Sequence, residues 1–302
     1  MIHVVGHTAI DHISTVHHLP DKNTSTHITD HKIFFGGGAA NIAAGIAMLG
    51  EPCTLVSCVG DDFSGTDYDQ WMKRLGIRQQ FFFVPGTHTP TAFMFTDEAG
   101  DQMTFFEWGA SKAFATKTEK APSLPFVHMA TADPDFNCRV AEKGGFVSFD
   151  PGQDVFWYSK GELDSIISNT DILFANQHEV QGMCRTLGIT KEALIGRVDT
   201  AIFTMSGDGS MLYHDGKEEF VPAVPVRLSD PTGAGDSYRA GFLTAYARGY
   251  ALPNCCRVGT VTASFVVEHP GCQTHLPDWD AMLARFCRHF GAPDEPGEQR
   301  FA

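Results

Sequence analysis

The segment DPTGAGDSYRAGF, from Asp230 to Phe242, joins a turn of small residues to a segment of helical composition and places a carboxylate where the two meet. Gly233, Ala234 and Gly235 leave the backbone N–H groups uncovered, and a helix that begins near Gly235 adds the positive end of its dipole at the same point. Asp236 would face this anion-binding turn, in position to take a proton from a hydroxyl group that attacks a nearby phosphorus atom. The segment therefore predicts phosphoryl transfer.

A purely structural interpretation is a glycine-rich turn that caps a helix, with Asp236 near the N-cap, where such residues stabilise a helix by about 1 kcal/mol. Two other nucleotide-binding motifs do not fit these residues. A Walker loop requires Gly-Lys-Ser/Thr after its glycines, and the chain contains no such tripeptide. A dinucleotide fingerprint requires a third glycine where Tyr238 stands, and the bulky ring would obstruct helix–strand packing.

Length and composition favour a folded chain with one large core, with or without a smaller appendage. The chain has 302 residues, 43% of them hydrophobic and 19% charged. Its formal charge of −14 opposes nucleic-acid binding, because affinity for a polyanion comes largely from Lys and Arg. The weakly polar run at 36–50 is too short to cross a bilayer, so we expect no membrane partner. A small phosphorylated ligand has to be held by backbone amides and a divalent cation.

The N-terminal segment MIHVVGHTAID lacks the features of an export signal and is predicted to be a first strand. The cysteines form no CxxC pair, so we expect free thiols in a reducing cytoplasm. A metal site built from the N-terminal histidines is the alternative to ordinary solvated side chains. The histidines lack the helical i, i+4 pairing of a zincin, which favours the solvated interpretation. They are His12, His17, His18, His27 and His31.

Strand and helix signals alternate along most of the chain, which predicts an α/β fold with a doubly wound, mostly parallel sheet flanked by helices. Short apolar runs predict strands at 53–59, 126–130, 145–149, 171–175 and 200–205. Helices are predicted at 39–49, 64–75, 235–249, 253–268 and 279–290. We assign residues 1–11, 36–90 and 108–302 to this large domain, and expect 293–302 to be disordered.

Residues 12–35 and 91–107 break the alternation. In the second region, TAFMFT and QMTFFE flank the turn DEAG, a pattern typical of antiparallel strands. We expect the two regions to form a small β-sheet over the cleft, a lid that excludes water when substrate is bound. An exposed edge of the lid also offers a place for a second copy of the chain, which predicts a homodimer.

Several of these segments resemble one family. DPTGAGDSYRAGF resembles the C-terminal signature of the ribokinase-like, or PfkB, carbohydrate and nucleoside kinases, and FFGGGAANIAAGIAMLG at 34–50 resembles their N-terminal signature. The resemblance continues through VGDDFSG at 59–65, NQHE at 176–179 and the closing PGCQTHLP. VGHTAID and SFDPGQD at 148–154 are most similar to archaeal nucleoside kinases. The resemblance implies a ribokinase-like fold and transfer of phosphate from ATP, with Mg²⁺, to an alcohol group.

The resemblance also implies roles for the residues at matching positions. Asp236 is the implied base, and the amides of Gly233, Ala234 and Gly235 form the implied anion hole for the transferring phosphoryl group. The residues implied to hold the sugar of the substrate are Asp11, Gly36, Gly37 and Asn41. Structural alternatives for these are a close-packed helix start for GGGAANIA and a strand-end turn for Asp11.

The nucleotide-binding residues implied by the family are Asn176, Thr204, Gly207 and Gly209. Glu179 is implied to orient the water molecules of Mg²⁺, although Asn176 and Glu179 also have the spacing of a helix-capping box. Asp230 and Thr232, with the region of Gly271, resemble sites that bind a monovalent cation such as K⁺. The nucleotide loop departs from the family pattern Thr-x-Gly-x-x-Gly, because TMSGDGS has Ser206 at its first glycine position. ATP is therefore the default donor rather than a deduced one.

The predicted activity is phosphorylation of the 5′-hydroxyl of a nucleoside of the adenosine, cytidine or inosine type. A kinase for ribose or fructose with the same fold and a non-catalytic nucleotide-binding regulator remain alternatives. Few Lys or Arg residues lie in the lid or near Asn41, which argues against a phosphorylated sugar. Four lid aromatics provide either a stacking surface for a base or ordinary packing. They are Phe93, Phe95, Phe105 and Phe106.

Overall fold

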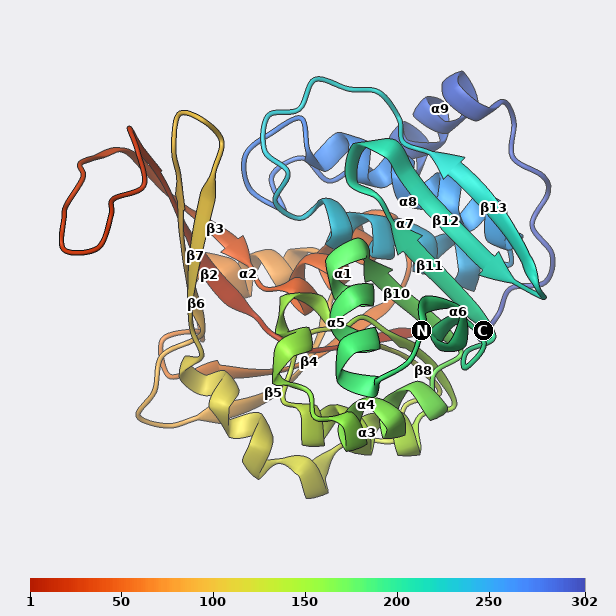
Figure 1. The fold of residues 1–302 in the computed structure, drawn as a ribbon, viewed down its shortest axis with the longest axis horizontal. Coiled ribbons are helices and arrows are strands. Elements are labelled where there is room, and N and C mark those ends of the chain that lie inside the picture. Colours follow the sequence, from red (N-terminus) through yellow and green to blue (C-terminus); the bar gives the residue numbers. More distant parts are fainter. Residues whose placement is uncertain (302) are drawn as a thin grey trace.

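Short runs of buried apolar residues form the larger of two sheets in the computed structural model, which describes residues 1–301. In β4 (Cys53–Gly60) every residue is buried, as in a parallel strand covered on both faces. The nine strands lie in the order β13-β12-β11-β10-β9-β8-β1-β4-β5 (Figure 1). The others are β1 (Ile2–Val5), β5 (Arg78–Val84), β8 (Phe126–Met129), β9 (Phe146–Phe149), β10 (Ile172–Asn176), β11 (Thr200–Thr204), β12 (Gly209–His214) and β13 (Lys217–Pro222).

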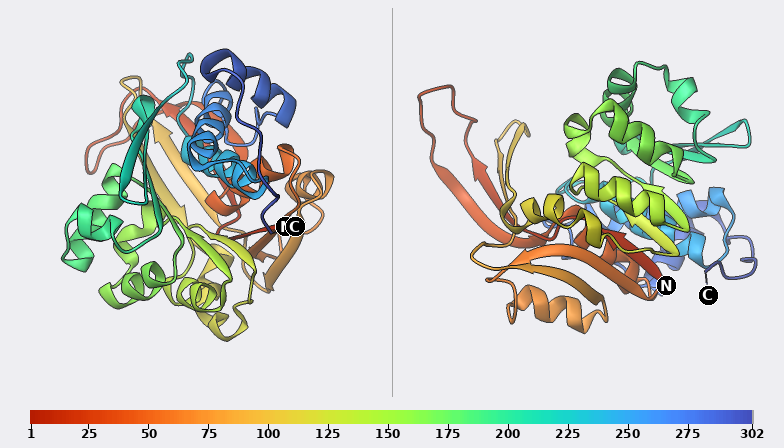
Figure 2. Two further views of the ribbon diagram at one scale, coloured as in Figure 1. Left: turned by 90° about the vertical axis from the view of Figure 1, so that its right-hand side faces the viewer. Right: turned by 90° about the horizontal axis from the view of Figure 1, so that it is seen from below.

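The strands from β5 to β11 in this order are parallel, and only the hairpin of β12 and β13 adds antiparallel pairs. Helices cover both faces of the sheet (Figure 2). One face carries α1 (Gly38–Met48), α2 (Asp67–Arg74), α7 (Ala234–Ala247), α8 (Leu252–Val266) and α9 (Trp279–Phe290). The other carries α3 (Pro134–Lys143), α4 (Lys160–Ser168), α5 (Gln177–Leu187), α6 (Lys191–Ile195) and the 3₁₀ helices η1 (Gly109–Thr116) and η3 (Gly152–Trp157). The predicted doubly wound, mostly parallel sheet is confirmed.

The parallel strands bring polar residues from distant parts of the chain to one edge of the sheet. His7 follows β1, Asp150 follows β9, and Asn176 and Thr204 end β10 and β11. Asn176 and Thr204 are partners in the β10–β11 register. Ligand sites of open α/β sheets form at this carboxyl edge of the strands.

The smaller sheet has the order β3-β2-β6-β7 and stands to one side of the larger one (Figures 1 and 2). It consists of β2 (Ala9–Val16), β3 (Ile28–Gly36), β6 (Thr91–Thr96) and β7 (Gln102–Glu107). The expected antiparallel pairing is present in β2–β3 and β6–β7, while β2 and β6 are parallel. The strands extend beyond the expected range 12–35 at both ends. Asp11 and Gly36 therefore lie on the small sheet rather than on the large one.

Residues of the tail that was expected to be disordered, 293–302, contact the large domain, and Ala302 lies outside the described residues. Arg300 N–H donates to the Ala247 carbonyl at 2.8 Å, and its guanidinium binds two carbonyls near the end of α7. The Phe301 ring packs against Phe126 with the ring centroids 4.6 Å apart. Composition alone missed these anchors because they depend on tertiary contacts.

Within residues 1–301, all eight cysteines are free. The described residues contain no group of three or more His, Cys, Asp or Glu side chains arranged to hold a metal ion. None of the helices in this part of the chain has the length and apolar character needed to span a bilayer.

Helices α1 and α7 approach closely because small residues face each other. A Cβ atom on Gly45 would lie 2.6 Å from the Cβ of Ala240, which has no flexible atoms to move aside. This contact fixes the distance between the two helices that carry Asn41 and Asp236.

We predict that Gly45→Ala lowers stability by about 1 to 2 kcal/mol, because overpacking outweighs the gain in helix propensity. The matched control is Gly161→Ala in α4, where a Cβ meets nothing within 4 Å and the change is expected to be neutral or slightly stabilising. Thermal unfolding of both variants measures the difference. Equal unfolding midpoints would contradict the close packing of α1 on α7.

Candidate active site

The N-terminal end of α7 forms the centre of the candidate site. Gly233 is the N-cap, with a φ of 80° that favours glycine. A Cβ there would also lie 2.8 Å from Cys272. The Ala234 N–H donates to the Pro231 carbonyl at 3.2 Å, whereas the N–H groups of Gly233 and Gly235 have no partner within residues 1–301. Two free amides and the positive end of a helix dipole are features of anion-binding sites, and here they lie beside Asp236.

Asp236 is held by a directional chain of side-chain hydrogen bonds. Asn41 Nδ2 donates to Asp236 Oδ2 at 2.9 Å, and Gln273 Nε2 donates to Asn41 Oδ1 at 2.9 Å. The Trp71 indole N–H donates to Gln273 Oε1 at 3.0 Å. An indole only donates and a carboxylate only accepts, so the two ends fix the orientation of both amides between them. This hydrogen-bond network therefore directs an N–H donor of Asn41 toward Asp236.

Tyr68 completes this network on its buried side. Gln273 Nε2 also donates to the Tyr68 hydroxyl at 2.8 Å, which in turn donates to the Gly36 carbonyl at 2.8 Å. Both hydrogens of the Gln273 amide are therefore used. The network joins α1, α2, β3 and the loop that contains Gln273, and it holds them around Asp236.

Burial raises the pKa of Asp236 to about 6, although the hydrogen bond from Asn41 and the charge of Arg239 oppose the shift. Burial also raises the pKa of Asp11 to about 7, with further contributions from the charges of Asp236 and Asp230. A carboxylate whose pKa lies near neutrality is suited to accept a proton. Both groups are ionised at a pH above these values.

The predicted sugar-binding residues surround Asp11, which lies on β2 with only 6% of its surface exposed. A Cβ on Gly36 would collide with the Asp11 carboxylate, and a Cβ on Gly37, which has a φ of 91°, would lie 2.6 Å from the His7 carbonyl oxygen. Asn41 lies in the first turn of α1. The structure thus brings Asp11, Asn41 and Asp236 together from β2, α1 and α7.

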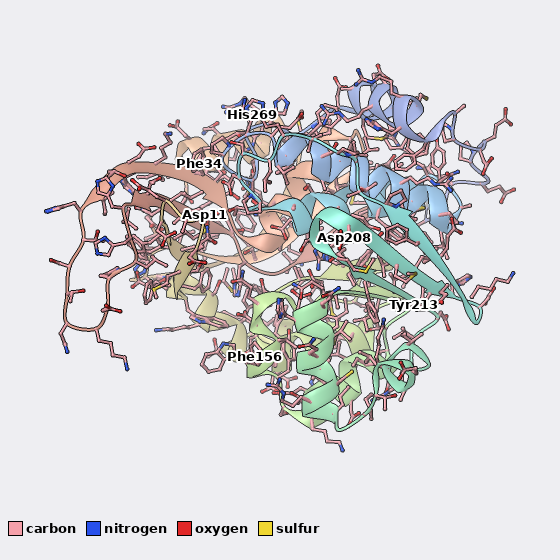
Figure 3. All side chains as sticks on the ribbon, turned by 45° about the horizontal axis from the view of Figure 1, so that its top comes forward. Asp11, Phe34, Phe156, Asp208, Tyr213 and His269 are labelled. Carbon is pink, nitrogen blue, oxygen red and sulfur yellow. The ribbon has the colours of Figure 1, made fainter. Side chains whose placement is uncertain are left out.

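Three of the four lid aromatics lie on the wrong face to stack on a base beside Asp11. Side chains alternate along a strand, and the registers place Phe106 on the face of Asp11. The other three, Phe93, Phe95 and Phe105, lie on the opposite face. The Phe106 ring is 5.1 Å from the ring of His7. Figure 3 labels Asp11 and Phe34 on the strands of this sheet.

The predicted nucleotide residues gather at the ends of β10 and β11. Asn176 caps α5, and Glu179 completes the capping box by accepting from the Asn176 N–H at 2.7 Å and from Nδ2 at 2.8 Å. Gly207 is exposed in the turn η4 (Ser206–Asp208) that follows Thr204 and β11. Gly209 has a φ of 128°, and a Cβ there would strike the backbone of β13.

Ser206, the departure from the family loop, has a φ of 50°. Left-handed backbone costs a residue with a Cβ roughly 1 to 2 kcal/mol, so Ser206 keeps a glycine-like backbone at some cost.

A buried cluster of opposite charges lies beneath these residues. Arg239 of α7 forms an ion pair with Asp150, and its Nη2 is 3.8 Å from Oε2 of Glu179. Burial raises the pKa of Glu179 to about 7, the charge of Asp150 adds to the increase, and Arg239 opposes it. Through these contacts the cluster connects the first turn of α5 with the first turns of α7.

The residues expected at a monovalent cation site also lie together. Thr232 N–H donates to Asp230 Oδ1 at 2.9 Å, and Gly271 N–H donates to Asp230 Oδ2 at 3.3 Å. Gly271 has a φ of 86°, and its missing Cβ leaves room for the ring of Phe34 from β3. The loop of Asp230 and Thr232, the loop of Gly271 and the small sheet therefore meet at this point.

Sequence reasoning missed three residues of the site, although each lies in a segment that it singled out. They are Gln273 in PGCQTHLP, Asp150 in SFDPGQD and Arg239 in DPTGAGDSYRAGF. The available signal for Arg239 was a charged residue among small and apolar neighbours in a helix. Nothing local to Gln273 indicated that it orients Asn41.

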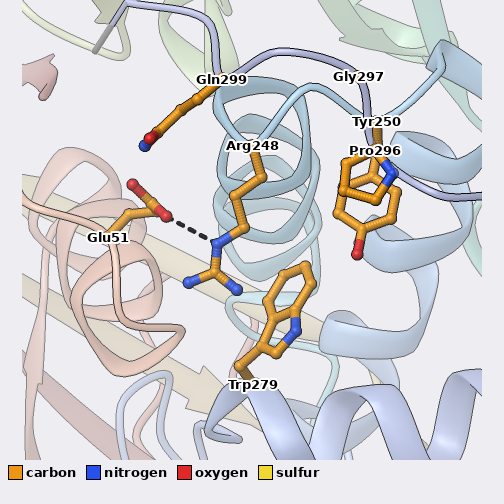
Figure 4. Close-up of a pocket in the computed structure, with 7 residues that line it drawn as sticks. All are labelled: Glu51, Arg248, Tyr250, Trp279, Pro296, Gly297 and Gln299. Atoms are coloured by element: carbon orange, nitrogen blue, oxygen red, sulfur yellow. Dashed lines mark hydrogen bonds and ion pairs between the residues drawn. The ribbon is translucent and has the colours of Figure 1, made fainter.

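A surface pocket of about 390 Å³ lies away from these residues (Figure 4). It surrounds Arg248, next to the C-terminal end of α7, whereas Asp236 lies in the first turn of that helix. Its other lining residues are Glu51, Tyr250, Trp279, Pro296, Gly297 and Gln299. The pocket contains none of the convergent polar groups described above, so we assign it no part in the site.

Comparison with solved structures gives the same fold over nearly the whole chain. The crystal structure of the Methanocaldococcus jannaschii nucleoside kinase superposes with a TM-score of 0.89 over 95% of this chain and 98% of that one. The Burkholderia thailandensis nucleoside kinase, at 26% identity, gives 0.89 in complex with inosine, over 97% of this chain and 100% of that one. It gives 0.79 in ligand-free form, over 95% and 100%.

Sequence comparison identifies the family. The chain is 44% identical over 290 residues to the M. jannaschii nucleoside kinase, with 94% of this chain and 96% of that protein covered. It is 41% identical over 297 residues to the nucleoside kinase of Methanothermobacter thermautotrophicus, with 95% and 96% covered. The model of the pfkB family of carbohydrate kinases matches residues 1–279. The chain therefore belongs to the pfkB carbohydrate kinase family and is a kinase, a phosphotransferase that acts on an alcohol group.

Proposed function

We propose that this kinase transfers the γ-phosphoryl group of ATP to the 5′-hydroxyl of a nucleoside. The observation that carries the proposal is the position of Asp236, which is buried, receives a hydrogen bond from Asn41, and lies beside the free amides of Gly233 and Gly235. A base and an anion site at one point are what in-line phosphoryl transfer to an alcohol requires.

In the proposed reaction, the 5′-oxygen attacks the γ-phosphorus while its proton passes to Asp236. The bond from the 5′-oxygen to phosphorus forms as the bond from phosphorus to the β,γ-bridging oxygen of ATP breaks, and ADP leaves. The Gly233 and Gly235 amides and the α7 dipole stabilise the charge on the transferring group, since they already point at it before the reaction. Asp11 and Asn41 orient the ribose.

The residues present fit a magnesium ion held largely through water. Glu179 and Asp150 are carboxylates near the nucleotide residues, and the described part of the chain lacks the cluster of three ligands that would form an all-protein cage. Mg²⁺ keeps several waters and needs few protein ligands when phosphate oxygens bind it. When bound, the ion neutralises charge on the β- and γ-phosphates. Asn176 and Glu179 would orient its water molecules.

The similarity of this chain to nucleoside kinases supports a nucleoside rather than a free sugar as the acceptor. The two archaeal relatives compared above are nucleoside kinases, and the Burkholderia structure contains inosine. This chain also has a higher TM-score with the inosine complex than with the ligand-free form, which supports a small sheet that acts as a lid over bound substrate. A ribose or fructose kinase remains the second candidate.

Three further features complete the proposal. Asp230, Thr232 and the loop at Gly271 would bind a monovalent cation such as K⁺, because the Thr232 and Gly271 N–H groups hold the Asp230 carboxylate in place close to the turn at Gly233. The free thiols suit the reducing cytoplasm. Thr204, Gly207 and Gly209 would contact ATP, with the glycine-like Ser206 backbone preserving the loop.

We also propose that the chain forms a homodimer through its small sheet. The face opposite Asp11 carries Ile33 at 60%, Phe105 at 59% and Met103 at 45% exposure. Clustered apolar side chains of this size mark interaction surfaces more often than isolated ones do. A second copy of the same sheet would cover them.

The activity is tested by ADP release over a panel of nucleosides and sugars. We expect the highest kcat/KM with a nucleoside and a fall in kcat of at least about 1,000-fold in Asp236→Asn, since that variant lacks the base but keeps the shape of the site. Asp236→Asn is also expected to unfold at an equal or higher temperature, because it removes a buried charge. Turnover near the wild-type rate in this variant would remove the mechanism, and a sugar as best acceptor would favour the second candidate.

The orienting role of Gln273 predicts a shift in pH dependence. Gln273→Met frees Asn41 to rotate, so Asp236 loses its hydrogen bond and its pKa rises above about 6. The base acts in its ionised form, so activity is lost as pH falls through this pKa. We therefore expect the acid limb of kcat/KM to move up by roughly 0.5 to 1 pH unit. Trp71→Phe removes only the outermost donor of the network, so it should shift the acid limb less than Gln273→Met does. A larger shift in Trp71→Phe would refute the orienting role of Gln273.

The proposed dimer predicts a change in mass. Ile33→Glu combined with Phe105→Glu should convert a dimer to a monomer in sedimentation experiments, because the charges would be buried at the contact. Phe220→Glu, on the exposed part of β13, is the matched control and should leave the mass unchanged. A wild-type monomer at micromolar concentration would contradict the proposal.

A further inference from the structure

Arg239 is a buried guanidinium at the centre of the site. It follows Asp236 by one turn of α7, and only 4% of its surface is exposed. Helical side chains point back toward the helix N-terminus, so the Arg239 side chain runs beneath Gly235. A Cβ on Gly235 would lie 2.5 Å from Nη1. The guanidinium therefore lies directly under the turn that bears the free amides.

The other edges of the guanidinium face two carboxylates from distant elements. Nε pairs with Asp150, which follows β9, and Nη2 lies 3.8 Å from Oε2 of Glu179 on α5. Asp150 also accepts from the Gly152 N–H at 3.0 Å, and Glu179 accepts from both nitrogens of Asn176. Arg239 is thus the side chain that contacts the α7 turn and both carboxylates.

Stability alone is a weak explanation for this arrangement. A buried ion cluster costs desolvation energy, and well-packed apolar residues often give equal or greater stability. The ring of Phe174, 5.9 Å from the guanidinium carbon, shows that an apolar surface lies next to it. A planar guanidinium is instead suited to fix several groups at once, because its five N–H donors are rigidly arranged.

We propose that Arg239 is a positioning residue for phosphoryl transfer, which holds Asp150, Glu179 and the Gly235–Asp236 turn in one fixed arrangement and places its positive charge beneath the anion site. The inference rests on the proposed function for its catalytic meaning. It also assigns a reason for glycine at position 235, where a side chain would displace the guanidinium. Arg239 itself need not touch the substrate.

The kinetic test uses Arg239→Met, Arg239→Lys and the matched control Arg248→Met. Arg248 lies next to the other end of α7, pairs with Glu51 at 2.7 Å and stacks on Trp279 at 3.8 Å (Figure 4). We expect kcat to fall about 100-fold in Arg239→Met while the nucleoside Kd, measured by calorimetry, changes by less than about threefold. Arg239→Lys restores part of kcat because it keeps the charge but loses the planar fork.

Arg248→Met should lower the unfolding temperature but keep kcat within about twofold of wild type. This comparison separates positioning from a general loss of stability. Equal losses of kcat in Arg239→Met and Arg248→Met, or a parallel loss of nucleoside affinity in Arg239→Met, would overturn the positioning role.

A second measurement needs no turnover. Gly235→Ala should lower the unfolding midpoint by roughly 3 to 8 °C in the wild-type background, and by less than half as much in Arg239→Ala, where the guanidinium is gone. Additive effects would overturn the inferred contact. If the wild-type chain turns over no acceptor in the panel, the proposed function fails. The double-mutant cycle of Gly235→Ala and Arg239→Ala still decides whether Arg239 supports the α7 turn.

Discussion

A carboxylate that is buried beside uncovered amides keeps its charge only if a donor is held against it, and the bond from Asn41 to Asp236 meets that requirement. Asn41 can donate there because Gln273 occupies its oxygen, and Gln273 is oriented by the Trp71 indole. The state of one carboxylate therefore depends on contacts among α1, α2, α7 and the loop of Gln273. The tight packing of Gly45 on Ala240 fixes α1 and α7 at the distance that the bond needs.

The residues proposed to bind the nucleotide also converge from distant segments. The carboxyl ends of β9, β10 and β11 place Asp150, Asn176 and Thr204 at one edge of the sheet, and Arg239 reaches that edge from α7. Amides and one buried guanidinium supply positive charge in a chain whose net charge is −14. In the proposed function this local arrangement of donors outweighs the overall charge, since exposed charges are screened by solvent and these groups are not.

Much of the fold could be predicted from sequence because its signals are local. Apolar runs such as CTLVSCV and glycine-rich turns such as GAG correspond directly to β4 and to the start of α7. The small sheet was predicted with displaced ends, because the polar Asp11 and the glycines at 36–38 obscure the strand pattern. The contacts of Arg300 and Phe301, the outward face of Phe105 and the burial of Arg239 depend on the packing of distant segments. No local pattern could reveal them, nor the role of Gln273 in the orientation of Asn41.

The chemical nature of the Trp71–Gln273–Asn41 network limits what it can transmit. Its intermediate members are carboxamides, which have no proton to gain or lose at ordinary pH. The network orients the donor that binds Asp236, but it provides no proton-transfer path from Asp236 to solvent behind the site. Under the proposed function, a proton that Asp236 accepts from the substrate therefore leaves by a route other than this network, and the substrate side of the carboxylate is the route we propose.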